Sequence, residues 1–144
     1  MQPRPALALP LALALLGGGC TGLVAGPEVA ATTPVLASRD SAYVRARRGL
    51  TTESFTMDVV DSTRGRLTGT RYPGSNAQMG TGPRCRVVLA MDVSGGADAG
   101  EVSTTSRWVA PDQMADKAPQ VCEQERQDVL QRLTETLVPP PPAS

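Results

Sequence analysis

Three cysteines carry the most reactive side chains of this 144-residue chain: Cys20, Cys85 and Cys122. Cys85 and Cys122 are 37 residues apart and lack the C-x-x-C spacing that lowers the pKa of a catalytic thiol. The chain has no histidine, so a metal site would have to be built on two thiolates without imidazole. We therefore expect neither a redox-active pair nor a metal site, and the cysteines need a structural or processing role.

The absence of histidine also removes the usual general base at neutral pH and the partner of most serine or cysteine nucleophiles. Carboxylate pairs could still act in acid–base catalysis, and Asp58 with Asp61 or Asp92 with Asp98 are the candidates. Aspartates are common in turns and at strand ends, where they need no catalytic explanation. The glycine-rich segment 94–100 lacks the lysine and the following helix of a phosphate-binding loop. We expect no enzymatic activity and no cofactor.

The first twenty residues have the composition of an export signal. Arg4 gives the leader a positive charge, and Ala6 to Leu16 form an apolar run of eleven residues, whereas crossing a bilayer takes about 20. Gly17 to Gly19 are small residues directly before Cys20. This pattern resembles the signal of bacterial lipoproteins, in which the cysteine becomes the lipidated first residue. The resemblance implies a signal peptide at 1–19 and lipidation, palmitate included, at Cys20.

Two further positions bear on processing and destination. Lipoproteins usually carry leucine where this chain has Gly17, and an ordinary secretory signal cut after Ala25 is the alternative. Thr21 follows the cysteine, at a position where lipoproteins retained at the inner membrane usually carry aspartate. The resemblance therefore implies the outer membrane more than the inner one, with the protein facing the periplasm.

The lipoprotein resemblance also accounts for the odd number of cysteines. Lipidation of Cys20 leaves Cys85 and Cys122 as a pair in an oxidising compartment, where a disulfide can form and persist. Cys85 is in phase with the apolar face of a predicted strand, and Cys122 lies on the apolar face of the predicted last helix. We expect a disulfide between them.

Composition changes along the chain predict one domain with flexible ends. Residues 20–38 are rich in Ala, Thr, Pro and Gly without a sustained period, so we expect the lipidated cysteine to be followed by a flexible tether. Residues 39–137 carry the periodic patterns of a single domain. Residues 138–144 form a proline-rich tail that stops the last helix.

Hydrophobic spacing predicts an α+β fold for this domain. A first helix lies within 39–54 and is weakened at Gly49, where it could end, and a last helix runs from Pro119 to Leu137. Between them, alternation predicts strands at 55–60, 67–72, 85–93 and 101–109. We expect a small antiparallel sheet of about four strands, as two hairpins, with the N-terminal and C-terminal helices packed on one face, in the order α-β-β-β-β-α. This order resembles that of small envelope lipoprotein domains, including accessory lipoproteins of the outer-membrane assembly machinery.

Arg126 conflicts with this pattern, because it falls among Val129, Leu133 and Leu137 on the apolar face of the last helix. Burial of an unpaired charge is costly. We expect its guanidinium to reach the domain edge or a strand carboxylate such as Asp58 or Asp92.

Two surface features are candidates for contact with a partner. Arg45, Arg47 and Arg48 form a basic cluster on the first helix that could touch anionic lipid or an acidic protein, although a solvated helix face is the commoner interpretation. Trp108 could anchor a partner, or it could pack within the sheet.

The whole chain has fourteen basic and fourteen acidic residues, so it has no net positive charge that would favour binding to nucleic acid.

These patterns predict a membrane-anchored, periplasm-facing lipoprotein with a non-catalytic interaction or structural role in the cell envelope. Its partners would be the membrane, through the lipid, and another envelope protein. The alternative is a carrier or binding module for an apolar small molecule or lipid, held between the sheet and the helices.

Overall fold

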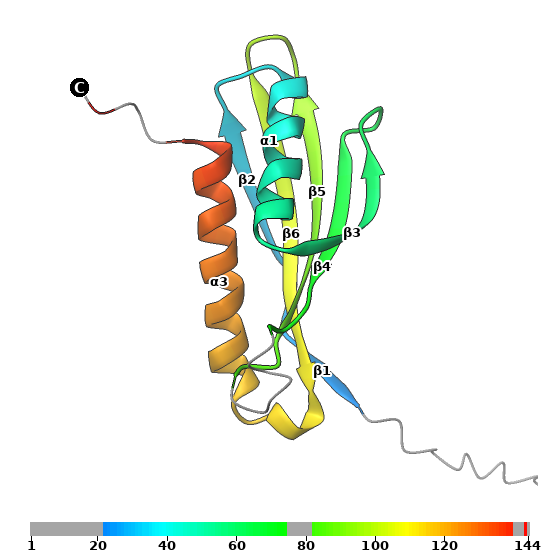
Figure 1. Ribbon diagram of the computed structural model, residues 1–144, viewed down its shortest axis with the longest axis vertical. Coiled ribbons are helices and arrows are strands. Elements are labelled where there is room, and N and C mark those ends of the chain that lie inside the picture. The colour runs from blue at the N-terminus through cyan, green and yellow to red at the C-terminus, as the bar shows by residue number, and fades with distance from the viewer. Residues whose placement is uncertain (1–21, 75–81, 140–142, 144) are drawn as a thin grey trace, which may run out of the picture.

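An antiparallel sheet forms one layer of the protein, and two helices cover one of its faces (Figure 1). The structure is a computed structural model that describes residues 22–74, 82–139 and 143. The strands are β1 (Leu23–Ala25), β2 (Val29–Val35), β3 (Phe55–Asp61), β4 (Arg66–Arg71), β5 (Arg86–Gly95) and β6 (Gly100–Pro111). The helices are α1 (Arg39–Thr52) and α3 (Ala118–Leu137), and a 3-10 turn η1 (Asp112–Met114) follows β6. The strand order is β1-β6-β5-β4-β3, and β2 also pairs with β6.

Strands β5 and β6 lie at the centre of the sheet and provide much of its core. Successive side chains of a strand point to opposite faces, so every second residue faces the helices. In β5 these are Val87, Leu89, Met91 and Val93, all buried, as the alternation in the sequence predicted. In β6 they include Val102, Thr104, Ser106 and Trp108. The other face of both strands carries no helix (Figure 1).

Helix α1 begins at a serine cap and continues past the glycine at which it was expected to weaken. Ser38 Oγ accepts a hydrogen bond from the backbone N–H of Ser41 at 3.1 Å, which satisfies one of the free N–H groups of the first turn. The helix passes through Gly49 to Thr52. A Cβ at position 49 would lie 3.1 Å from Leu133 of α3, so the glycine lets the two helices approach closely.

The expected flexible tether at 20–38 is wrong over most of its length. Residues 23–25 and 29–35 are the edge strands β1 and β2, which pair with opposite ends of β6. Edge pairing depends on backbone hydrogen bonds rather than on apolar alternation, so a segment of small and mostly exposed side chains can still form a strand. Pro34 is tolerated because β2 is at the edge. The domain therefore starts at the beginning of β1 rather than at residue 39.

The remaining predicted elements agree with the structure, apart from their number. Strands β3 to β6 lie at the four predicted positions and form the two predicted hairpins. The expected sheet of about four strands is therefore short by two, because β1 and β2 were not predicted. Both helices lie on one face, as expected. Cys20, most of the loop after Tyr72 and most of the proline-rich tail lie outside the described residues.

Candidate functional site

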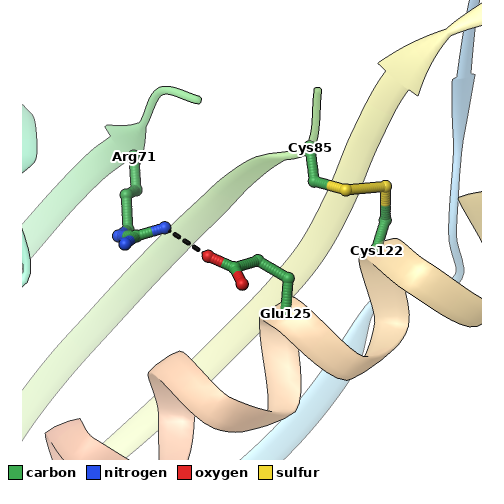
Figure 2. Close-up of a disulfide and its surroundings, with 4 residues drawn as sticks. All are labelled: Arg71, Cys85, Cys122 and Glu125. Carbon is green, nitrogen blue, oxygen red and sulfur yellow. Dashed lines mark hydrogen bonds and ion pairs between the residues drawn. A yellow bond between two sulfur atoms is a disulfide. The ribbon is translucent and has the colours of Figure 1, made fainter. Parts of the chain in front are cut away.

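A disulfide joins the segment before β5 to the first turns of α3 (Figure 2). The sulfur atoms of Cys85 and Cys122 are bonded, and their Cα atoms are 5.3 Å apart. This is the pairing that the cysteine count led us to expect. Both cysteines are buried in a small cluster with Trp108, Ala110 and Ala118. The disulfide thus holds the lower part of α3, as drawn in Figure 1, against the start of β5.

Ion pairs fasten α3 to other elements beyond the disulfide. Arg71 Nη1 lies 2.5 Å from Glu125 Oε1, next to the disulfide (Figure 2). Arg71 Nε also donates to the backbone carbonyl of Glu53 at 2.9 Å, and the Glu53 carboxylate accepts from Arg132 Nε at 2.9 Å. These contacts connect β4, the end of α1 and the middle of α3, and they leave none of these charges free for a site.

Arg126 is buried and paired, but not with the carboxylates that we expected. Its Nε donates to Glu123 Oε2 at 3.0 Å, its Nη2 pairs with Glu123 Oε1, and its Nη1 donates to Ser106 Oγ at 3.1 Å. The hydrogen bonds from Arg126 hold the pKa of Glu123 below its ordinary value, and the carboxylate raises the pKa of Arg126.

The expected partners of Arg126 are engaged elsewhere. Asp92 pairs with Arg66 Nη1 at 3.6 Å, and Asp58 accepts a hydrogen bond from Thr70 Oγ1 at 3.4 Å. In β5, Asp92 alternates with the buried residues and therefore faces away from α3. A residue one helical turn away on α3 can reach Arg126, and a residue on the far face of the sheet cannot.

The predicted partner-contact residues do not form one surface. Arg45 Nη1 donates to the backbone carbonyl of Leu137 at 3.3 Å, so this arginine links α1 to the last turn of α3. Arg47 and Arg48 line a shallow hollow on the outer side of α1. Trp108 is 5 % exposed and packs in the cluster around the disulfide, which favours the packing interpretation.

The structure has an open pocket that the sequence did not reveal. It has a volume of about 480 Å³ and lies where β1 meets the end of β6. Its walls include apolar side chains and two guanidinium groups: Leu23, Tyr72, Arg84, Arg86, Val109 and Pro111. We call it the β1 pocket.

The β1 pocket is on the face of the sheet that the helices leave open. Leu23 is opposite Pro111, and Arg86 is opposite Val109, so each pair shares a face. Trp108 and Ala110, which alternate with Val109 and Pro111 along β6, are buried on the helix face. Leu23 is 58 % exposed and Tyr72 is 52 % exposed, although both are apolar in bulk. Arg86 Cζ lies 5.4 Å from the centroid of the Tyr72 ring, a cation–π contact.

The β1 pocket does not follow from the sequence pattern, because its residues belong to different predicted elements. Leu23 falls in the predicted tether, and Arg84 falls between the strands predicted at 67–72 and 85–93. One signal was available: Tyr72 and Arg84 flank the connection between two strands predicted to lie in one sheet. Antiparallel pairing of β4 with β5 brings the two flanks together.

Two other kinds of site are absent from the described part of the chain. Within residues 22–74 and 82–139, no three acidic or cysteine side chains gather closely enough to hold a metal ion. No helix in these ranges is both long and apolar enough to cross a membrane.

The sequence matches no protein-family model and no curated protein. The fold does match solved structures. Truncated norcoclaurine synthase from Thalictrum flavum superposes with a TM-score of 0.51 at 10% identity, covering 85% of this chain and 99% of that one. Ara h 8.0201 superposes with a TM-score of 0.53 at 8% identity, covering 81% and 99%. At these identities the likeness extends to the fold alone, an antiparallel sheet with one early and one C-terminal helix of the Bet v1-like kind.

Proposed function

We propose that this chain is an exported lipoprotein, anchored through Cys20, whose domain is a non-catalytic binding module of the cell envelope. The observation that carries the proposal is the disulfide between Cys85 and Cys122. A structural disulfide is typical of an oxidising, exported compartment. It also leaves Cys20 as the one remaining cysteine of the chain, directly behind a segment with the composition of an export signal.

The position of β1 supports cleavage before Cys20 over cleavage after Ala25. An ordinary signal peptidase cutting after Ala25 would remove the whole of β1. That strand pairs with β6, and the backbone N–H of Asp112 donates to the carbonyl of Gly22 at 3.0 Å. Val24 packs against the cluster that contains the disulfide. Cleavage before Cys20 keeps all of these contacts in the mature protein.

The lipid anchor would hold the domain close to the membrane, because no long tether separates them. Cys20 precedes Leu23 by three positions, and three extended residues span at most about 11 Å. We assign the anchor to the outer membrane with the domain in the periplasm, on the basis of Thr21 after the cysteine.

The proposed binding role is supported less strongly than the lipid anchor, and its support comes from the fold and from the β1 pocket. A Bet v1-like fold is consistent with a binding module. The hollow beside α3 is less suited to an apolar cargo, since its volume is about 270 Å³ and its walls include Arg126, Gln127 and Gln131. The carrier alternative therefore depends on the β1 pocket rather than on the space between the sheet and the helices.

The anchor is tested by the mass of the mature N-terminus and by fractionation. In a bacterial host, the N-terminal peptide should begin at Cys20 and carry acyl chains, and the protein should remain with the membrane. Cys20→Ser should release it, whereas the neighbouring control Thr21→Ser should leave it membrane-bound. An unmodified N-terminus beyond Cys20 would refute the proposal.

A further inference from the structure

The β1 pocket combines positive charge with exposed apolar surface. Arg84 and Arg86 are its charged residues, and no carboxylate is among the side chains that line it. Within the described residues, neither guanidinium forms an ion pair. Arg86 is oriented by the Tyr72 ring beneath it. Such a pocket suits an anionic group attached to an apolar body.

We propose that the β1 pocket binds the phosphate head group of an anionic phospholipid in the membrane to which the protein is anchored. The inference rests on the proposed function, because the anchor at Cys20 is what brings the pocket to the bilayer. Leu23 lines the pocket and is separated from Cys20 by at most about 11 Å of chain. The head groups on the membrane surface are therefore within reach of the pocket.

The orientation of the domain follows from the same position. Figure 1 shows β1 at one end of the sheet, and the C-terminal end of α3 lies toward the other. An anchor just before β1 turns this end of the domain, and with it the pocket, toward the bilayer. Arg47 and Arg48 are on α1, which packs on the opposite face of the sheet, so they do not share the pocket.

Each part of the pocket has a role in this contact. Guanidinium groups bind phosphate oxygens through paired hydrogen bonds. Tyrosine side chains favour the level of the head groups, and Leu23 can enter the apolar boundary beneath them. Asp112 lies against Gly22 beside the pocket and adds a negative charge at this end. Binding therefore depends on direct contacts of the two arginines rather than on a general positive field.

The first experiment couples the mature-length protein through its Cys20 thiol to a maleimide-bearing lipid in vesicles. This attachment does not require lipidation in a cell, so the pocket is tested independently of the proposed function. Each arginine is then labelled with phenylglyoxal and quantified by peptide mass mapping. In vesicles containing phosphatidylglycerol, Arg84 and Arg86 should be labelled several-fold more slowly than in pure phosphatidylcholine, with Arg47 and Arg48 unchanged.

Three outcomes would overturn the inference. Equal labelling of Arg84 and Arg86 in both kinds of vesicle would exclude recognition of the anionic head group. Equal protection of all four arginines would indicate a diffuse electrostatic effect. Protection by inorganic phosphate over phosphatidylcholine vesicles would indicate a site for the free ion instead of a lipid. If the labelling shows no specific protection but Cys20 is acylated in cells, the pocket proposal fails and the lipid anchor stands. If Arg84 and Arg86 are protected but Cys20 is not acylated in cells, the lipid anchor fails and head-group binding by the pocket stands.

A second experiment compares two charge-matched variants of the unanchored Cys20→Ser protein. Near an anionic surface each basic residue strengthens binding on the order of fivefold. Arg84→Gln with Arg86→Gln should therefore weaken co-flotation with phosphatidylglycerol vesicles by roughly 30-fold. Arg47→Gln with Arg48→Gln removes the same charge and should have little effect. Equal losses in the two variants would contradict a specific pocket.

Discussion

Arg126 is a buried charged residue of α3, and one of its hydrogen bonds ties the helix to the sheet. Its guanidinium is buried and bonded to Glu123 and to Ser106 Oγ. We expect Arg126→Ala to lower the free energy of unfolding by about 1 to 3 kcal/mol, because Ser106 loses a buried partner and the stem leaves a gap. Denaturant titration measures the change. The control Arg64→Ala removes a largely exposed arginine and should stay within about 0.5 kcal/mol of the parent.

Glu123 provides a second measurement of the same pair. Its pKa is lowered chiefly by the hydrogen bond from Arg126, so the folded state favours the carboxylate. The stabilising contribution is present above the unfolded pKa of about 4.3 and is lost as the pH falls through the lower folded value. The stability difference between the parent and Glu123→Gln should therefore shrink in acid. A difference that does not depend on pH would show that the pair is solvated.

At the scale of elements, the segment that forms β1 and β2 differs most from its prediction, which was a flexible tether. A substitution at Gly26 tests whether this segment is a paired edge of the sheet. The backbone N–H of Gly26 donates to the Trp108 carbonyl at 3.0 Å, and a Cβ at position 26 would overlap the indole ring. We expect Gly26→Ala to destabilise the fold by about 1 to 3 kcal/mol through overpacking. Gly96→Ala is the matched control, since a Cβ there meets nothing within 4 Å. Equal thermal midpoints for the two variants would favour a loose tether over a paired edge.

The disulfide acts between elements, because it joins the start of β5 to α3 across 37 residues of chain. In the chain-entropy model, closing such a loop stabilises the fold by about 4 kcal/mol, and measured values are often lower. We expect the double variant Cys85→Ala with Cys122→Ala to lose most of this stability in denaturant titration. Reductant should lower the midpoint of the parent and leave that of the variant unchanged. Free thiols at both cysteines in exported protein would contradict the pairing.

For the whole molecule, the placement of both helices on one face leaves the opposite face of the sheet open (Figure 1). The apolar residues of α1 and α3 pack against each other and against the alternating side chains of β5 and β6. The β1 pocket is therefore on a surface that no other element of the described chain covers. The pocket lies near the N-terminal end of β1, so the proposed lipid anchor at Cys20 would place it close to the membrane.

The periodic spacing of apolar residues was enough to predict the elements that bury one apolar face. The alternation of Val87, Leu89 and Met91 identified β5, and the spacing of Val129, Leu133 and Leu137 identified the buried face of α3. The odd number of cysteines and the glycines before Cys20 led to the expected disulfide and to the anchor hypothesis. Each of these signals belongs to a short stretch of chain, so no knowledge of distant contacts was needed.

Only the tertiary structure decided the features that depend on contacts between distant segments. The pairing of β1 and β2 with β6 is made by backbone groups, which leave little trace in side-chain pattern. The tertiary structure also decided that Arg126 donates to Ser106 of β6, and that Asp92, on the far face of the sheet, pairs with Arg66 instead. The β1 pocket required Leu23, Tyr72 and Arg84 to meet at one end of the sheet. Periodicity assigns a residue to a face of its own element, whereas strand pairing and register determine which residues of other elements lie beside it.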